Sequence, residues 1–303
     1  MRSVSSVVLC CLRLHPASLG NCRAPRCPHI VRTILETPDT LAIVAGNGSY
    51  PFAMARGARK AGVKRIVAAS FTDETSSTLA AEVDDIAWLR VGQLGKLLSY
   101  LKKSGTRHAV MAGQIAPKNL FDLRPDFKAL FLLAKLKRRN AETIFAAIGD
   151  EMQKVGVELL PATTFMDDHL APAGLIAGPK VKARVLDDLR YGHDLAKEVS
   201  RLDIGQTVLV KNGTVLAVEG FEGTNECIKR GGALGRGDAV MVKVSKPDQD
   251  LRFDVPVIGT VTIETCREAG VRIIGIEAGR TIILERDRVT ALAAQHKLSI
   301  FGL

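Results

Sequence analysis

Leu41-Ala-Ile-Val-Ala45, followed by Gly46-Asn47-Gly48-Ser49 and Pro51, is the stretch that decides the fold. An apolar run that ends at glycine and leads into a helical pattern over 51–61 is typical of a buried strand, a tight turn and a helix. The alternation continues with strand patterns at 65–69, 86–91 and 108–112 and a helical pattern at 94–103. Strands that alternate with helices at this spacing predict βαβ units, and therefore a doubly wound parallel sheet.

The second half of the chain mixes hairpin and parallel connections. Asn212-Gly213 separates two strand patterns at 206–210 and 214–218, and this dipeptide predicts a hairpin because both turn positions need positive φ. The other predicted elements are a charged helix at 180–201, strands at 239–244, 271–276 and 281–284, and a helix at 261–269. We therefore expect an α/β protein of two domains, an N-terminal doubly wound domain over 40–160 and a C-terminal mixed α/β domain over 161–303.

A basic helical segment at 126–153 is predicted to link the two domains. Between Lys128 and Arg139 it interleaves Lys and Arg with leucines and Phe131. One interpretation is a linker helix with a solvated basic face. The other is a helix that lies on an anionic membrane, with its apolar residues in the acyl region and its cations near the headgroups. The sequence leaves both interpretations open.

The composition excludes several classes of protein. The 303 residues are 47% hydrophobic, which is too apolar for a disordered chain, and no stretch reaches the roughly 18 consecutive apolar residues that span a bilayer. The formal net charge of +10 raises the question of an anionic partner, which could be nucleic acid, a phosphorylated metabolite or a membrane surface. With one Trp and three Tyr, a stacking platform for single-stranded nucleic acid is not expected. We predict a phosphate-bearing small molecule or an anionic surface as the partner, and no nucleic acid.

Residues 1–39 differ in character from the rest of the chain. They hold four of the six cysteines, and their five arginines face acids only at Glu36 and Asp39. Arg13 interrupts the apolar run that a secretory signal would need. A transit peptide stays open, but we interpret the segment as an extension outside the fold, because a strand begins abruptly at Leu41. The two remaining thiols, Cys227 and Cys266, suit a reducing compartment such as the cytoplasm.

The glycine-rich turn at 46–49 is a candidate phosphate site. It lies between a predicted strand and a predicted helix, where backbone N–H groups favour a phosphate. It matches the dinucleotide fingerprint only in part, because Pro51 stands where that fingerprint has Gly and the strand ending at Phe71 has no acid for a ribose hydroxyl. The motif therefore disfavours an NAD-dependent dehydrogenase, and a plain tight turn is the alternative.

The stretch from Lys243 to Pro256 is the strongest chemical signal. Within twelve residues it concentrates three cations, three carboxylates and a Gln around Pro247. Cations can neutralise a pyrophosphate, and carboxylates can hold a divalent ion or activate water, which is the set that phosphoryl hydrolysis requires. The alternative is a solvated turn.

Two smaller motifs have structural explanations. Glu222-Gly223-Thr224-Asn225 stands where a strand leads into a helix, and Thr224 or Asn225 could cap that helix. Asp167-Asp168-His169 has the chemistry of metal ligands. Adjacent residues in a chain seldom face one ion, so we expect a polar loop there.

Six motifs, in order and in register, resemble those of the LpxI family over roughly residues 41–303. They are Leu41 to Pro51, Asp203-Ile-Gly-Gln206, Glu222-Gly-Thr-Asn225, Lys246-Pro-Asp-Gln249, Arg252-Phe-Asp-Val-Pro-Val-Ile-Gly259 and Glu277-Ala-Gly-Arg-Thr281. Members of this family are UDP-2,3-diacylglucosamine pyrophosphatases of lipid A biosynthesis. The resemblance does not extend to residues 1–39.

The resemblance implies a hydrolase that cleaves UDP-2,3-diacylglucosamine to UMP and 2,3-diacylglucosamine 1-phosphate (lipid X), with Mg²⁺ or another divalent cation. Water attacks the sugar-side phosphorus, and the aspartate that the family needs falls on Asp254. The metal ligands stay unknown. The positions implied for the substrate are Gly46, Asn47, Gly48, Gly113, Gln114, Gln206, Thr224, Asn225, Lys243, Lys246 and Gln249.

The resemblance also bears on the setting of the protein. It implies a cytoplasmic protein, and peripheral contact with the anionic inner membrane is part of this expectation. The oligomeric state is left open, with a homodimer as one option. The alternative function is a non-catalytic nucleotide-sugar binding protein, in which Asp254 would be only a hydrogen-bond acceptor.

Two positions depart from the family pattern. Asn225 stands where many members have Asp, and an amide is uncharged and a poorer ligand for a divalent ion. We expect this residue to hydrogen-bond a base, ribose or phosphate rather than to bind metal. Asn47 stands where glycine is usual, and Asn still permits positive φ.

Overall fold

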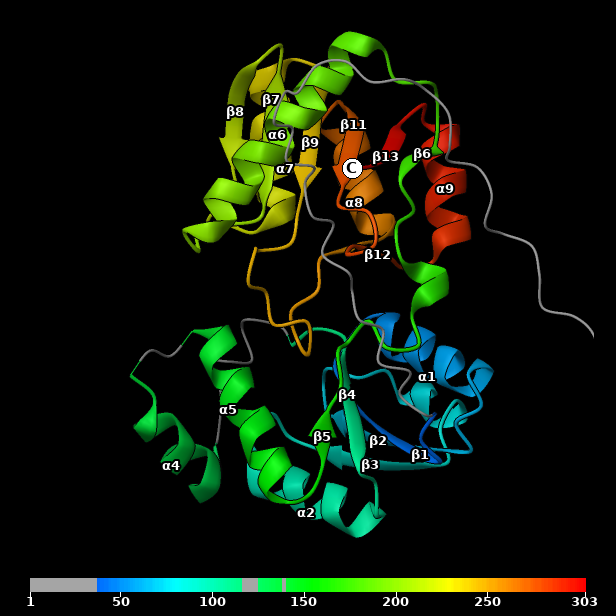
Figure 1. The fold of residues 1–303 in the computed structure, drawn as a ribbon, viewed down its shortest axis with the longest axis vertical. Helices are drawn as coiled ribbons and strands as arrows, with labels where there is room; N and C mark the ends of the chain where they lie inside the picture. The colour runs from blue at the N-terminus through cyan, green and yellow to red at the C-terminus, as the bar shows by residue number, and fades with distance from the viewer. Residues whose placement is uncertain (1–36, 116–124, 138–139) are drawn as a thin grey trace, which may run out of the picture. The chain divides into compact units, whose positions relative to one another are not determined.

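The computed structural model describes residues 37–115, 125–137 and 140–303, and these residues build two main β-sheets with helices packed against them (Figure 1). The predicted N-terminal extension lies outside the described residues, apart from its last three positions. Among the described residues, no helix is both long enough and apolar enough to cross a membrane.

The first sheet is parallel throughout and has the strand order β3-β2-β1-β4-β5. Its strands are β1 (Thr40–Ala45), β2 (Arg65–Phe71), β3 (Asp85–Leu89), β4 (His108–Ala112) and β5 (Glu158–Leu159). The helical elements of this half are α1 (Tyr50–Lys60), the 3-10 turn η1 (Ser77–Ala81), α2 (Leu94–Ser104), α4 (Phe127–Lys135) and α5 (Ala141–Lys154).

Alternate residues of β1 explain why helices cover both faces of this sheet. Leu41 and Ile43 lie in a core with residues of α1, whereas Ala42 and Val44 lie in a second core with residues of α2, α4 and α5. Successive side chains of a strand point to opposite faces, so an uninterrupted apolar strand requires cover on both sides. The predicted doubly wound parallel sheet is confirmed.

The strand order of the first sheet reverses beside β1. The chain runs outward from β1 through β2 to β3 and then returns to β4 on the other side of β1. In an open parallel sheet, such a switch point separates the loops at the carboxyl ends of two neighbouring strands, and ligands bind there. The two loops concerned follow Ala45 and Ala112, and they contain the predicted Gly46 to Gly48 and Gly113-Gln114.

The second sheet is mixed and has the strand order β6-β13-β11-β9-β7-β8. Its strands are β6 (Gly174–Ala177), β7 (Thr207–Lys211), β8 (Thr214–Val218), β9 (Ala239–Lys243), β11 (Val271–Ile276) and β13 (Ser299–Gly302). A 3-10 turn, η2 (Asp167–His169), precedes it, and β10 (Val257–Ile258) pairs with β12 (Ile282–Ile283) in a separate two-stranded sheet. The helices are α6 (Ala183–Arg201), α7 (Thr224–Gly235), α8 (Thr260–Glu268) and α9 (Arg286–Gln295).

The helices of this half also divide between the two faces of the sheet. Residues of α6 share a core with Val208 and Val242, whereas α7, α8 and α9 contribute to a core with Leu209 and Met241. The hairpin at Asn212-Gly213 is confirmed, with φ of 50° and 71° at its two turn positions. The mixed α/β architecture that the sequence predicted is therefore correct.

The predicted linker helix over 126–153 is two helices. α4 ends at Lys135, and α5 begins after Asn140, whose side chain accepts a hydrogen bond from the Thr143 N–H at 3.0 Å. A strong N-cap residue explains why a second helix starts there. Arg138 and Arg139 lie outside the described residues, and the domain boundary at 160/161 stays a prediction.

Candidate functional site

The loops after β1 and β4 are hydrogen-bonded to each other. The Gly46 N–H donates to the Ala112 carbonyl and the Asn47 N–H to the Gln114 carbonyl, both at 2.8 Å. A Cβ at Gly46 would lie 2.4 Å from the Gln114 oxygen, and one at Gly113, where φ is 96°, would lie 2.6 Å from the Asn47 oxygen. Backbone therefore approaches backbone so closely that both positions require glycine.

The turn from Asn47 to Ser49 leads directly into α1. Gly48 has a φ of 85°, whereas Asn47 does not use the left-handed region, so the glycine takes the strained position of the turn. The Asn47 amide donates instead to Glu74 at 2.8 Å. Ser49 makes no side-chain cap, and no acid lies in the first turn of α1. The first N–H groups of this helix are therefore suited to an anion.

Lys243, the last residue of β9, forms the centre of a second cluster. The side chain is buried, and its Nζ donates to Thr224 Oγ1 at 3.2 Å, which in turn donates to Glu219 Oε1 at 2.8 Å. Burial lowers the pKa of Lys243, although the charges of Glu219 and Asp254 oppose this shift. When it is charged, this ammonium is weakly screened by water, and the carboxylates of Glu219 and Asp254 are the charges nearest to it.

Helix α7, which carries Thr224, starts one residue earlier than the predicted caps. Gly223, with φ 81° and ψ 169°, occupies the N-cap of α7, so the expectation that Thr224 or Asn225 caps the helix is wrong. A glycine reaches this backbone conformation without a steric penalty, which frees the Thr224 hydroxyl for Glu219 and Lys243. Asn225 is exposed in the first turn of the helix.

The loop after β9 brings Lys246, Gln249 and Asp254 together. The Lys246 N–H donates to Gln249 Oε1 at 2.7 Å. Its ammonium is ion-paired with Asp203 and lies 3.6 Å from Glu142 Oε2 of α5. This last contact joins the start of α5 to the loop.

Asp254 is a partly buried carboxyl in this loop. Burial raises its pKa, and the charge of Glu142 adds to the effect. The Gln249 amide and the charges of Lys246 and Lys243 act in the opposite direction without cancelling it. A carboxyl whose pKa is raised toward the working pH is a better proton acceptor than an ordinary exposed aspartate.

Arg252 does not join the lysines beside Asp254, although the sequence grouped the three cations. Its guanidinium binds the Asp250 carboxylate with two parallel contacts, Nε to Oδ1 at 2.9 Å and Nη2 to Oδ2 at 2.6 Å. This pairing holds the pKa of Asp250 below its usual range. A bidentate pair two residues apart is geometrically favoured, and it leaves Lys243 and Lys246 as the cations that act on Asp254.

Glu277 is the centre of a buried hydrogen-bond network that the sequence did not predict. The Glu277 carboxylate accepts hydrogen bonds from the Ser245 N–H at 2.8 Å, the Ser245 hydroxyl at 2.5 Å and Lys197 Nζ at 3.1 Å. Lys197 also donates to the Ser245 carbonyl at 2.8 Å. Burial alone would raise the pKa of Glu277, but these hydrogen bonds hold it below its usual range. The network fixes the backbone between Lys243 and Lys246.

Two buried acceptors near Lys243 have no hydrogen-bond donor within the described part of the chain. They are Gln206 Oε1 and Glu219 Oε2. Gln206 directly precedes β7, and its carbonyl accepts from the Val244 N–H at 3.0 Å, so it lies beside the end of β9. A buried acceptor without a donor costs stability, and a bound ligand that donates an N–H or O–H would relieve this cost.

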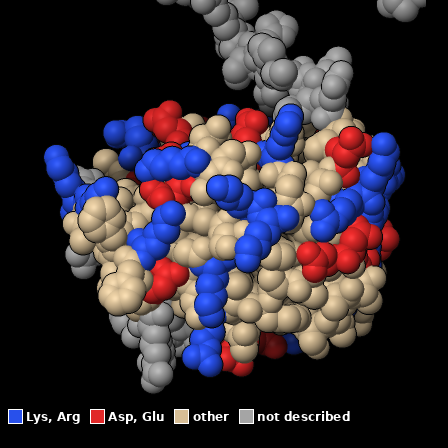
Figure 2. Space-filling model, turned by 90° about the horizontal axis from the view of Figure 1, so that it is seen from below, with Lys and Arg blue, Asp and Glu red and all other residues tan. Residues whose placement is uncertain are grey.

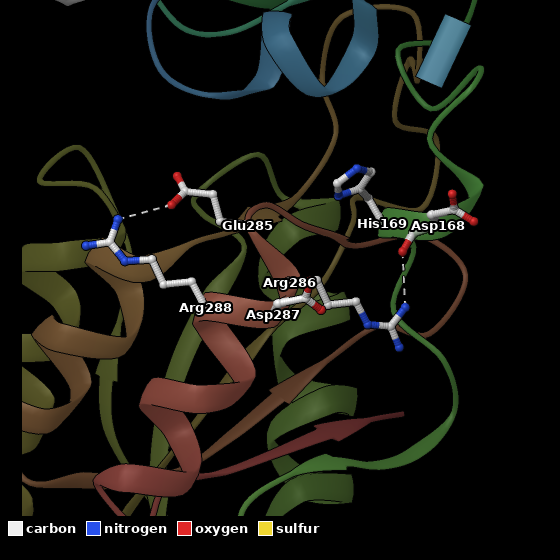
Figure 3. A pocket seen from close by; sticks show the side chains of 6 residues that line it. All are labelled: Asp168, His169, Glu285, Arg286, Asp287 and Arg288. Atoms are coloured by element: carbon white, nitrogen blue, oxygen red, sulfur yellow. Dashed lines mark hydrogen bonds and ion pairs between the residues drawn. The ribbon is translucent and has the colours of Figure 1, made fainter. Parts of the chain in front are cut away.

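A separate surface pocket contains none of the predicted site residues (Figure 3). Asp168 and His169 line it from η2, so the predicted polar loop is a short 3-10 turn. Arg286 donates to the Asp168 carbonyl at 3.1 Å, and Arg288 pairs with Glu285 at 3.3 Å. The Asp168 carboxylate pairs with Lys60, which does not line this pocket. Over the described ranges, no group of three or more His, Cys, Asp or Glu side chains is arranged to hold a metal ion.

Comparison with known proteins places both halves in one family. The LpxI N-terminal domain matches residues 40–169, and the LpxI C-terminal domain matches residues 172–301. The UDP-2,3-diacylglucosamine pyrophosphatase LpxI of Caulobacter vibrioides is 31% identical over 278 residues, which cover 87% of this chain and 97% of that protein. The solved structure described as "Crystal structure of gox2253" aligns over 87% of this chain and 89% of its own at 12% identity, but its TM-score of 0.29 is too low to support an argument. Two matched domains and a relative of nearly the same extent show that the chain belongs to the LpxI family.

Proposed function

We propose that this protein is a hydrolase that cleaves the pyrophosphate of UDP-2,3-diacylglucosamine to UMP and 2,3-diacylglucosamine 1-phosphate, a step of lipid A biosynthesis. The name of the Caulobacter relative calls that protein a UDP-2,3-diacylglucosamine pyrophosphatase. The observation that carries the proposal here is Asp254, a partly buried carboxyl with a raised pKa that lies in the field of Lys246 and Lys243.

In this proposal the two lysines hold the pyrophosphate. Lys243 is buried, so its attraction for an anion is weakly screened by water. Lys246 is paired with Asp203 and Glu142 in the structure, and both carboxylates are exposed enough to exchange their partner for a phosphate. The negative charges of the two phosphates in the pyrophosphate would be neutralised by the two ammonium groups.

Asp254 acts as the general base. It takes a proton from a water molecule, the water oxygen bonds to the sugar-side phosphorus, and the bond from that phosphorus to the bridging oxygen breaks. The bridging oxygen leaves with UMP. The raised pKa of Asp254 makes the carboxylate a stronger base toward the attacking water. The lysines neutralise the charge that moves onto the leaving oxygen.

The residues fit a divalent cation that arrives with the substrate. Mg²⁺ is commonly bound by one or two carboxylates together with substrate phosphates, rather than by a cage made only of protein. Asp254 would be its protein ligand in this arrangement, through the carboxylate oxygen that does not take the proton. When bound, the cation would neutralise phosphate charge and lower the pKa of a coordinated water.

Residues of the remaining predicted set would position the nucleotide. Gln206 Oε1, a buried acceptor without a donor among the described residues, suits the uracil N–H or a ribose hydroxyl. The turn at Gly46 to Gly48 and the start of α1 suit a phosphate or sugar oxygen. We place the enzyme in the cytoplasm at the inner membrane, where its lipid substrate resides, and its assembly as a homodimer stays a prediction.

The test is incubation of the purified protein with UDP-2,3-diacylglucosamine and Mg²⁺, followed by detection of UMP. Release of UMP that needs Asp254 supports the hydrolase. Tight binding of the nucleotide-sugar without release of UMP, at any concentration of Mg²⁺ or Mn²⁺, would instead identify a nucleotide-sugar binding protein.

A further inference from the structure

Helix α4 exposes an apolar stripe on its outer side. Phe127, Leu130 and Phe131 are 92%, 49% and 65% exposed, and Ala134 continues the row. These positions follow the i, i+3, i+4, i+7 spacing of one helix face. The helix is a formed element, because Asp126 caps it by accepting a hydrogen bond from the Ala129 N–H at 2.9 Å.

The opposite side of the same helix is also apolar. Ala129 is buried, and Leu132 packs against the core that it shares with α2 and α5. A surface helix of a globular protein normally presents one apolar face to the core and polar residues to water. α4 therefore has a second apolar face, and two exposed phenylalanines on one turn are the pattern of a binding surface rather than of a solvated one.

The surroundings of the stripe are basic. Lys135, whose Nζ lies 4.2 Å from the centre of the Phe131 ring, and the exposed Lys137 lie at the end of the helix. The neighbouring α2 is tied to α4 by the Gly95 N–H, which donates to Asp126 at 2.7 Å, and it adds exposed lysines. Those lysines are Lys96, Lys102 and Lys103. Figure 2, which views the molecule from below Figure 1, shows many Lys and Arg side chains across that face, with uncharged surface and several Asp and Glu side chains between them.

From this combination we infer that the outer face of α4 docks on an anionic lipid bilayer. Phe127, Leu130 and Phe131 enter the boundary between headgroups and acyl chains, and the lysines of α4 and α2 meet the lipid phosphates. Aromatic side chains flanked by cations fit this interface, because the rings are apolar while the ammonium groups remain in the headgroup layer. The contact between Glu142 and Lys246 brings α5, the next helix along the chain, against the candidate catalytic loop.

The test is co-sedimentation of the full chain with vesicles of phosphatidylglycerol and phosphatidylethanolamine, with phosphatidylcholine vesicles as the neutral comparison. We expect binding to the acidic vesicles, at least about tenfold weaker binding to the neutral ones, and release as the salt concentration approaches about 1 M, where the screening length falls to about 3 Å. The vesicles contain no substrate, so this result does not depend on the proposed hydrolase activity.

Two sets of variants assign the binding to the helix. The double variant Phe127→Ser/Phe131→Ser should lose vesicle binding by about tenfold or more, and Lys135→Glu/Lys137→Glu should lose the preference for acidic lipid. The matched control is Leu234→Ser/Val261→Ser, which removes two exposed apolar side chains from α7 and α8 and should bind like the unmodified protein. Circular dichroism and thermal unfolding check that each variant folds.

Three results would overturn the inference. The first is an unmodified protein that stays in the supernatant with acidic vesicles. The second is a Phe127→Ser/Phe131→Ser variant that sediments as well as the control. The third is a protein that is dimeric in analytical ultracentrifugation, becomes monomeric in the phenylalanine variant and never binds vesicles, because the stripe would then be an interface between copies.

Discussion

The two parts of the candidate site present different chemical groups. The turns after β1 and β4 present main-chain groups, and their identity is fixed by the close approach of Gly46 and Gly113 to the opposite backbone. The cluster after β9 presents charged side chains, with Lys243 and Asp254 held in one field. In the main-chain part, an added Cβ would collide with the opposite backbone, so these positions do not accept a larger residue. In the side-chain part, we expect a substitution that removes a charge to be more damaging than one that changes only the shape of the side chain.

The largest expected effect is on turnover, from Asp254→Asn. The amide keeps the shape of the carboxyl but cannot accept the proton, so kcat should fall by about 10²–10⁴ while substrate binding survives. Steady-state release of UMP and a separate binding titration measure the two effects. Asp248→Asn, at an exposed position of the same loop, is the control and should leave kcat unchanged. A fully active Asp254→Asn enzyme would move the chemistry elsewhere.

The next effect tests the main-chain part through stability. Gly113→Ala places a Cβ 2.6 Å from the Asn47 oxygen at a φ of 96°. The steric clash and the strain of the left-handed backbone both lower the free energy of unfolding. Gly48→Ala, at a φ of 85°, meets no atom within 4 Å and costs only the strain, about 1–2 kcal/mol. Overpacking typically costs a further 1–3 kcal/mol. Urea unfolding should therefore show Gly113→Ala to be the less stable by about that amount, and equal stabilities would mean that the two loops do not pack as described.

A third prediction tests whether Glu277 holds the lysines of the side-chain part in place. Glu277→Gln removes the charge that holds Ser245 and Lys197, so the segment between Lys243 and Lys246 should become less ordered. We expect kcat to fall by about tenfold with a smaller change in KM, because the lysines would no longer be fixed for the transition state. Glu264→Gln, which breaks only the exposed pair with Arg267, is the matched control. Equal losses of Tm and activity in both variants would indicate a general structural effect instead.

A fourth prediction uses the pH. Because the pKa of Asp254 is raised in the folded protein, folding favours its protonated form. The resulting stability is present below the unfolded pKa of about 3.9 and is lost as the pH rises through the folded value. Asp254→Asn should thus raise the Tm at neutral pH, and the difference should vanish below about pH 4. The same shift places the acidic limb of kcat/KM, which reports groups of the free enzyme, above the pKa of an ordinary aspartate.

The sequence predicts the main-chain part better than the side-chain part. Gly46 and Gly48 are recognisable because they follow an apolar strand, and strand alternation is enough to place both loops at the edge of one sheet. The partners of Lys246 come from distant positions, since Glu142 lies at the start of α5 and Asp203 in the turn after α6. Local charge counts cannot reveal such pairs, which depend on tertiary packing.

Arg252 illustrates the same limit. Its distance in sequence from Asp254 suggested a cluster of three cations, but Asp250 is equally near and offers both of its oxygens. Glu277 lies in a motif that the family resemblance singled out, yet nothing local indicates that it holds Ser245 across 32 positions. Helix starts are similarly sensitive, since a positive φ at Gly223 moved the cap of α7 by one residue.

The smallest expected effect concerns Asn225, which stands where many family members have Asp. It is exposed in the first turn of α7, and the ion-pair partners of Lys246 are Asp203 and Glu142, so Asn225→Asp should leave kcat within about twofold. A negative charge at a helix N-terminus is worth about 0.3–1 kcal/mol, but the neighbouring Glu226 reduces the gain, so the rise in unfolding free energy should lie at the lower end. Chemical denaturation and a Mg²⁺ titration of UMP release measure both quantities. A large rise in kcat together with saturation at much lower Mg²⁺ would show that this position binds the metal, and the side-chain part of the site would then extend from the β9 loop to the start of α7.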